Sequence, residues 1–263
     1  MIAATGRNAR HLSLAAIASA LTLLSSPANA AVTLDLGTAD GFAVLAGSGI
    51  TVAGAVKTTT IKGDIGTFPT LTITGLENMV LSGVNHGGDS VTQLAKTDLT
   101  AAYIEAAGRT YTVLFSDAYD LVGMTLTSGV YNSPSSLFLS GMLTLDGQGD
   151  PNSVWIFQAG STFTSASASQ VNLIGGAKPE NVFWQVGSSA TLGTDSDFSG
   201  SILALHSITM TTGATLNGRA LAMNGAVTMD NNSIVIPEPG SVLLLCTGLA
   251  TGLMIRRRPG HSA

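Results

Sequence analysis

The second half of the chain repeats a short pattern of apolar and polar residues. Three segments align at nearly equal intervals: Ser189–Leu192, Ser207–Met210 and Ala226–Met229. Each has a threonine at its third position: Thr191, Thr209 and Thr228. Two further rows of apolar residues follow these segments. One row consists of Phe198, Leu216 and Ile234, and the other of Ile202/Leu203 and Ala220/Leu221. An apolar residue about every six positions, inside a period near 18, indicates a coil with three short faces separated by turns.

The same register continues upstream with one interruption. Ser161–Phe163 aligns with Ala190–Leu192 after a longer interval than the later coils have, and we expect the extra length to fall at Gly175–Asn181. Earlier short apolar runs predict further strands: Leu137–Leu139, Met142–Leu145, Val154–Phe157, Phe42–Leu45, Ile50–Val52 and Leu71–Ile73. The repeat therefore predicts a β-solenoid rather than a sandwich of hairpins.

One segment, about residues 89–108, has helical rather than strand periodicity. Apolar residues recur at the spacing of one helix face: Val91, Leu94/Ala95, Leu99, Ala102/Tyr103 and Ala106. Asp89 or Ser90 can cap the start and Gly108 the end. Such a stripe needs a partner, and one flank of the solenoid is the simplest. We predict a mainly β fold: an irregular, right-handed β-solenoid of triangular cross-section with one long α-helix packed alongside.

The N-terminus, residues 1–30, has the pattern of a secretory signal peptide. Arg7 and Arg10 precede the apolar stretch Leu12–Leu24, and Ala28-Asn29-Ala30 provides small residues for cleavage. We therefore expect export through the Sec machinery. The folded domain is then expected at residues 31–236.

The C-terminal residues 237–263 resemble the PEP-CTERM sorting tail of Gram-negative bacteria. Pro237-Glu238-Pro239 is followed by the apolar run Val242–Ile255 and then by Arg256, Arg257 and Arg258. The positive-inside rule places these arginines on the cytoplasmic side of the inner membrane. The resemblance implies a membrane-anchored intermediate, processing by an exosortase near the motif, and a final place at the cell surface or in the extracellular matrix. An ordinary C-terminal anchor is the alternative.

Charge narrows the possible partners of the domain, and cysteine content narrows the ways in which the domain can be stabilised. Residues 31–236 contain six basic and fifteen acidic side chains, a net charge of −9, which disfavours binding to nucleic acid. The only cysteine, Cys246, lies in the tail, so the domain has no disulfide framework. Its stability must come from packing and backbone hydrogen bonds.

Several sequence segments of the domain, taken in order, resemble those of the DUF3494 family of bacterial and fungal ice-binding proteins. They include Leu36–Gly54, Gly63–Pro69, Leu143–Phe163, Asn181–Thr194 and Asn217–Ile234. The resemblance covers nearly all of residues 31–236. It implies the solenoid with a flanking helix, and binding to ice through one flat Thr/Ser-rich face.

The family's pattern on such a face is Thr, small residue, any residue, then Thr or Asn. Thr212-Gly213-Ala214-Thr215 matches it, which makes Thr212 and Thr215 the leading candidates for ice contact. The equivalent positions of neighbouring coils add four more: Thr194, Ser196, Ser167 and Ser169. Asp195, Asp197 and Asp230 interrupt this row, and strongly hydrated charges are expected to weaken binding. The alternative is that these residues form solvated turns.

No constellation in the sequence favours an enzyme or a metal site. The domain's two histidines, His86 and His206, lie far apart along the chain, and Asp146–Ser153 lacks the ligand spacing of a calcium loop. We therefore expect no catalytic residues, no metal and no cofactor. The competing function is a structural or adhesive matrix protein that binds exopolysaccharide without ice activity.

Overall fold

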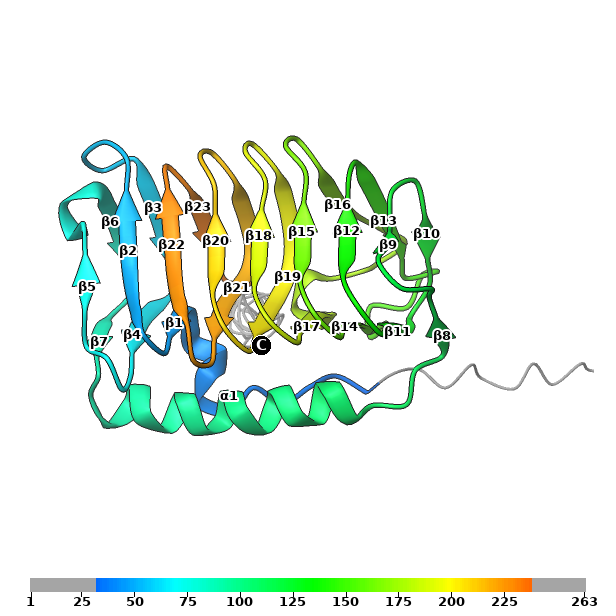
Figure 1. Ribbon diagram of the computed structural model, residues 1–263, viewed down its shortest axis with the longest axis horizontal. Coiled ribbons are helices and arrows are strands. Elements are labelled where there is room, and N and C mark those ends of the chain that lie inside the picture. The colour runs from blue at the N-terminus through cyan, green and yellow to red at the C-terminus, as the bar shows by residue number, and fades with distance from the viewer. Residues whose placement is uncertain (1–31, 238–263) are drawn as a thin grey trace, which may run out of the picture.

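The computed structural model describes residues 32–237. The predicted signal peptide and the tail from Glu238 onward lie outside the described residues. Within them the strands stack in parallel into a solenoid with three faces, and one helix lies along it (Figure 1). The predicted fold class is confirmed.

Each coil contributes one strand to each face in turn, named here faces a, b and c. The a strands are β8 (Val113–Leu114), β11 (Gly129–Ser133), β14 (Trp155–Ala159), β17 (Val182–Val186), β1 (Phe42–Ala46), β4 (Asp64–Thr67) and β7 (Asn85–Gly87). The b strands are β9 (Tyr119–Asp120), β12 (Leu137–Leu139), β15 (Phe163–Ser165), β18 (Ala190–Leu192), β20 (Ile208–Met210), β22 (Ala226–Asp230), β2 (Gly49–Ala53) and β5 (Ile73–Thr74). The c strands are β10 (Thr125–Leu126), β13 (Met142–Asp146), β16 (Gln170–Ile174), β23 (Ser233–Val235), β3 (Thr59–Lys62) and β6 (Met79–Ser82).

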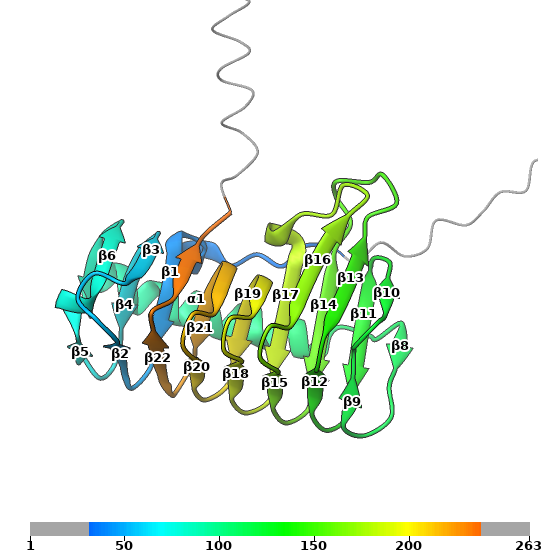
Figure 2. The same ribbon diagram turned by 90° about the horizontal axis from the view of Figure 1, so that it is seen from above.

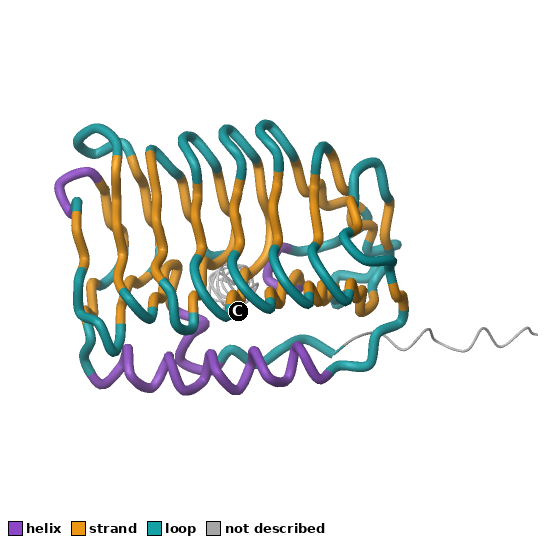
Figure 3. Tube along the Cα trace, in the orientation of Figure 1, coloured by secondary structure: helices purple, strands orange, loops and turns teal. Residues whose placement is uncertain are grey.

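Two long strands join face c to face a without a loop. β19 (Asp197–Ala204) and β21 (Thr215–Ala222) pass the corner through Gly200 and Gly218, both with positive φ. A Cβ on Gly218 would lie 2.0 Å from the carbonyl oxygen of Gly200, so only glycine fits where the two strands approach each other. The turns of successive coils lie side by side along the solenoid (Figure 3).

The order of coils in space differs from their order in sequence. The first strands of the domain cover the last coil: β2 pairs with β22, and β1 pairs with β21. The coil that begins at β4 then extends the stack beyond them. Covering the open edge of the C-terminal coil satisfies backbone groups that an edge strand would otherwise expose.

One predicted alignment is wrong by two positions. Thr164, rather than Thr162, pairs with Thr191, so this coil is slightly shorter than the alignment of the sequence suggests. The extra length lies between β16 and β17, where Pro179–Asn181 form a 3-10 helix, within the predicted segment. The other short 3-10 helices are Gly37–Gly41 and Leu76–Asn78.

Apolar side chains fill the solenoid from end to end. Along face a, Tyr131, Phe157 and Trp184 stack on one another, with ring centroids 5.4 and 4.1 Å apart. Trp184 also meets Phe163 beneath face b and Phe198 beneath face c. These shared aromatic contacts hold the three faces against one core.

Helix α1 (Ser90–Gly108) covers the outer side of face a (Figure 1). Its buried side forms a second apolar cluster with strand residues of face a, and the helix contributes Ala95, Leu99, Ala102 and Ala106. The helix follows its predicted range within a residue. Val91 and Leu94, predicted for the same stripe, are instead exposed, so the solvent side of α1 is partly apolar.

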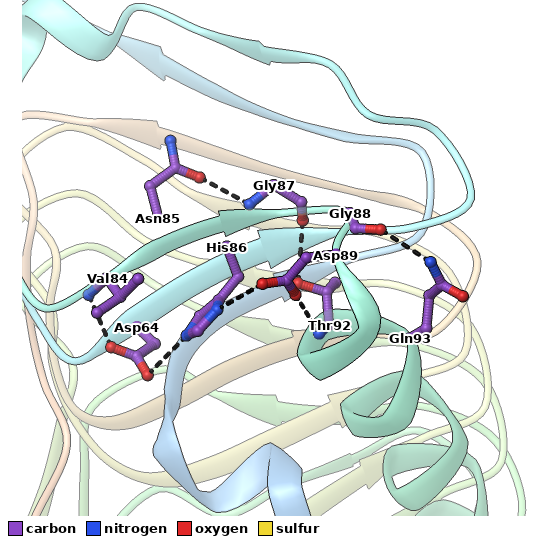
Figure 4. A network of polar contacts seen from close by, with 9 residues as sticks. All are labelled: Asp64, Val84, Asn85, His86, Gly87, Gly88, Asp89, Thr92 and Gln93. Atoms are coloured by element: carbon purple, nitrogen blue, oxygen red, sulfur yellow. Dashed lines mark hydrogen bonds and ion pairs between the residues drawn. The ribbon is translucent and has the colours of Figure 1, made fainter.

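Polar side chains fix both ends of α1. At the N-terminal end, Asp89 accepts a hydrogen bond from the Thr92 amide and contacts the His86 ring, whose other nitrogen lies 3.2 Å from Asp64 (Figure 4). At the C-terminal end, the Gln158 amide donates to the carbonyls of Ala106 and Arg109, both at 2.8 Å. These contacts satisfy helix-end groups that would otherwise lack partners.

Candidate functional site

Face b carries an unbroken column of threonines on its outer side. Cross-strand pairing places six of them side by side in neighbouring coils: Thr164, Thr191, Thr209, Thr228, Thr51 and Thr74. Parallel strands lie about 4.8 Å apart, so the column is roughly 24 Å long. We call it the threonine column.

Strand alternation explains why these threonines point outward. On either side of Thr209, Ile208 and Met210 are almost completely buried, and the same holds for Val227 and Met229 around Thr228. Side chains alternate between the two sides of a strand, so each threonine must face solvent. The buried neighbours and the β-branched side chain restrict the threonine rotamer, which orders the column before any ligand arrives.

Most residues on both sides of the column are small, and Leu76 at its end is the one large apolar exception. Two positions before each threonine stand residues with short side chains: Thr162, Ser189, Ser207, Ala226, Gly49 and Thr72. Two positions after lie Ala166, Gly193, Thr211, Asp230, Ala53 and Leu76. Asp230 is the only charged residue among these twelve.

Some hydroxyl groups on face b form hydrogen bonds within the domain, and others do not. The Ser189 and Ser207 hydroxyls accept hydrogen bonds from the amides of Ser207 and Ala226 in the next coil, both at 3.2 Å. In the column, Thr74 donates to Thr51 at 3.3 Å. The other four column hydroxyls have no hydrogen-bond partner among residues 32–237 and are therefore free to bind water or an external surface.

The column ends at β12. There the outward position paired with Thr164 is Phe138, and the next coil places Asp120 beside it. An aromatic ring and a carboxylate break the regular spacing of methyl and hydroxyl groups, so the uniform surface covers six coils.

The structure separates the six predicted contact residues instead of placing them on one face. Thr194 and Ser167 are exposed, but they lie in the turns between faces b and c. Ser169 and Ser196 are wrong as surface contacts, because they are 0% and 1% exposed and their hydroxyls point into the interior. Thr212 also lies in a turn, where it donates to Asp230, whereas Thr215 begins face c and donates to Asp197 at 2.8 Å.

Backbone conformation explains why segments such as Thr212–Thr215 form the corner between faces b and c and not part of one face. Ala168, Asp195, Gly213 and Asn231 occupy matching places in successive turns, and all have positive φ. Asp, Asn and Gly adopt this left-handed conformation most readily. The aspartate at position 195 is thus explained by the turn, and its side chain does not lie in the threonine column.

The sequence contained a signal for the column that our prediction of the site did not use. Thr191, Thr209 and Thr228 align in the repeat, and each stands between two apolar residues. That alternation alone indicates an outward-facing row. Thr51 and Thr74 could not be added to it, because their coils join the stack out of sequence order.

Neither a metal cluster nor a membrane-spanning helix is present in the described part of the chain. Residues 32–237 contain no group of three or more His, Cys, Asp or Glu side chains placed to hold a metal ion. Among the same residues, no helix is both long and apolar enough to cross a bilayer. The threonine column is the most regular surface feature of this region.

Comparison with known proteins identifies the same parts of the chain. A family model described as ice-binding-like matches residues 44–235, and the PEP-CTERM protein-sorting motif, which indicates export and cell-surface sorting, matches residues 235–258. An ice-binding protein of Nostoc sp. (strain HG1) is 42% identical over 253 residues, which cover 91% of this chain and 92% of the relative.

Solved structures agree with the fold. A crystal structure of an ice-binding protein from an Antarctic biological consortium superposes with a TM-score of 0.76 at 45% identity, covering 79% of this chain and 93% of that one. The ice-binding protein of the Antarctic ascomycete Antarctomyces psychrotrophicus gives a TM-score of 0.76 at 42% identity, covering 79% of this chain and all of that one. The chain belongs to the ice-binding-like family.

Proposed function

We propose that the protein binds ice, and that face b is the surface that adsorbs to the crystal. The observation that carries this proposal is the threonine column, in which six threonines stand in continuous register. Several of its hydroxyls are free, and most of the residues beside it have small side chains. The similarity to proteins named ice-binding supports the same function.

A regular array suits a crystalline ligand because the ligand is itself periodic. Each threonine offers one methyl and one hydroxyl group at a spacing set by the backbone. Individual contacts of this kind are weak, but a rigid array makes many of them at once with little loss of side-chain entropy. Adsorption of this type involves no covalent step, and we propose that the protein is not an enzyme.

The positions of the acidic residues are compatible with this role. Asp195 and Asp197 lie in a turn and on face c, away from the column. Asp230 lies at the rim of face b, but its carboxylate accepts a hydrogen bond from Thr212. Of the three aspartates expected to weaken ice binding, only Asp230 lies beside the threonine column.

The tail supports delivery to the outside of the cell. We propose that the signal peptide directs export through the Sec machinery, and that the apolar run holds the protein in the inner membrane of a Gram-negative bacterium. An exosortase then cuts near Pro237-Glu238-Pro239 and passes the domain to the surface or matrix. The mass of the mature protein tests this step: a mass that includes Arg256–Arg258 would contradict processing.

The decisive experiment compares ice growth in the presence of three purified proteins. The wild type is expected to shape ice crystals and slow recrystallisation, and Thr209→Tyr in the centre of the column is expected to abolish both. Asn217→Tyr, on face c of the same coil, is the matched control and should remain active. No effect of the wild type at high concentration would refute ice binding and leave exopolysaccharide as the ligand to test.

A further inference from the structure

The C-terminal end of the domain leaves the solenoid at the corner opposite face b. The last strand, β23, lies on face c, and the Ile236 amide beyond it donates to the Lys62 carbonyl at 3.1 Å. Pro237 then lines a cavity of about 200 Å³ together with Leu34, Phe183 and Arg219. In a solenoid with three faces, the corner between c and a is the one that does not touch b. Figure 2 shows the last residues of the domain, in orange, on the side away from the b strands.

This corner is a rigid part of the domain. Arg219 is only 3% exposed, and its guanidinium contacts a carboxylate oxygen of Asp40 at 2.6 Å and the Asp40 carbonyl at 2.8 Å. A further contact to the Ser201 hydroxyl measures 3.3 Å. Arg219 thus ties β21 to the 3-10 helix Gly37–Gly41 directly beside Pro237. The position of Pro237, where the chain leaves the domain, therefore lies beside buried contacts.

The chain between this corner and the apolar run is short. Only the five residues 237–241 separate Ile236, just beyond β23, from Val242, where the apolar run starts. Five residues span at most about 18 Å when fully extended. A link of this length is too short to pass around the solenoid and bring face b against the surface that holds the tail.

We propose that the domain, once attached at the cell surface through its C-terminal end, presents the threonine column away from that surface and acts as an adhesin between the cell and ice. The proposal rests on the proposed ice-binding function of face b. Many copies held on one surface would bind a crystal together, and this raises the overall affinity without any new contact. A protein released from the surface would lack that gain.

Cysteine accessibility in the full-length protein tests the orientation. Cys246, the chain's only cysteine, is first replaced by serine. Thr209→Cys on face b and Asn217→Cys on face c of the same coil are then introduced separately. Membrane vesicles carrying each variant are treated with a bulky, impermeant polyethylene-glycol maleimide, and the labelling is repeated after release with detergent.

The expected result is a severalfold slower reaction of Asn217→Cys in vesicles than after release, with Thr209→Cys unchanged. A long Gly/Ser insertion after Pro237 should remove this protection. Equal changes at both positions, or protection of Thr209→Cys, would overturn the orientation.

A second measurement separates this proposal from ice binding itself. Vesicles with the wild-type chain should collect on a growing ice surface, and vesicles with Thr209→Tyr should not. If the released protein binds ice but the vesicles do not collect, the adhesin proposal is wrong. If the released protein fails to bind ice while the labelling asymmetry persists, the proposed function is wrong and the orientation stands.

Discussion

Faces b and c are built by the same coils, yet their outward side chains differ in kind. Face b presents the six threonines in register. The corresponding column of face c runs through Met142, Gln170, Asp197, Thr215, Ser233 and Thr60. On face c the hydroxyls pair with their neighbours: Thr215 donates to Asp197, and Thr60 donates to Ser233 at 3.2 Å.

The difference shows that backbone geometry alone does not determine the chemistry of a face. Both columns have the same spacing between strands, because the coils are continuous. What distinguishes face b is one repeated residue type whose neighbours are mostly small. Face c instead has a hollow of about 290 Å³, lined by residues that include Asp197, Asn217 and Val235. Chemical uniformity and flatness together define face b.

The largest effect should follow from placing a charge in the threonine column. Thr209→Asp introduces a carboxylate whose hydration competes with contact to the crystal, and we expect a loss of ice activity of about tenfold or more, the scale of a hot-spot residue. Recrystallisation rates measure it. Ser233→Asp adds the same charge to face c and is the control, which should retain activity. A similar loss in both variants would mean that net charge, rather than its position, is decisive.

A smaller effect, in the opposite direction, should follow from lengthening the column. Phe138 pairs with Thr164 at the column's end and is 36% exposed, so its ring lies at the surface of face b and not in the core. We expect activity to rise by up to about twofold, because one more coil joins the regular array. Unchanged activity, with unfolding temperature preserved, would show that the contact area does not reach this end.

A change of pH should affect stability but leave face b unaffected. Burial lowers the pKa of His86, but hydrogen bonds and charges from Asp89 and Asp64 outweigh it and hold the pKa above its ordinary value. The folded state therefore binds a proton more tightly than the unfolded state. The resulting stabilisation is complete below about pH 6.5 and is lost as pH rises through the folded pKa.

Thermal unfolding between about pH 6 and pH 8 measures this loss, and the His86→Gln variant should show a flatter profile over the same range. The ice activity of the folded wild type should not change over this pH range, because His86 lies in β7 on face a, beside the N-terminal end of α1, and not on face b. A decline of activity in parallel with stability would connect the two regions.

Part of this architecture could be predicted from the sequence, and the reason is periodicity. The regular repeat interval fixes the coil, and the helical spacing of apolar residues between Val91 and Ala106 identifies the helix. Both signals are local, since a strand or helix displays its own burial pattern. The order of the coils is not local. Thr51 lies near the start of the domain and its partner Thr228 near the end, and nothing in either strand specifies which exposed edge will be covered.

The placement of the predicted site residues was harder to infer from the sequence than the fold, for a related reason. A pattern of four residues such as Thr212–Thr215 indicates one face only if the backbone stays extended through it. Here Gly213 has a φ of 76° and turns the chain, so that the two threonines lie on different sides of a corner. Side-chain direction depends on this backbone angle, which composition does not give.

The smallest effect should come from making face c resemble face b chemically. Asp197→Thr would create a run of four hydroxyl residues on face c: positions 197, 215, 233 and 60. If hydroxyl content were sufficient, this change would restore activity to the Thr209→Asp variant. We expect no restoration, because Asn217 and Val235 still line the hollow and prevent flat contact. Recovery of ice shaping in the double variant would show that flatness is dispensable, and the distinction between the two faces would then rest on chemistry alone.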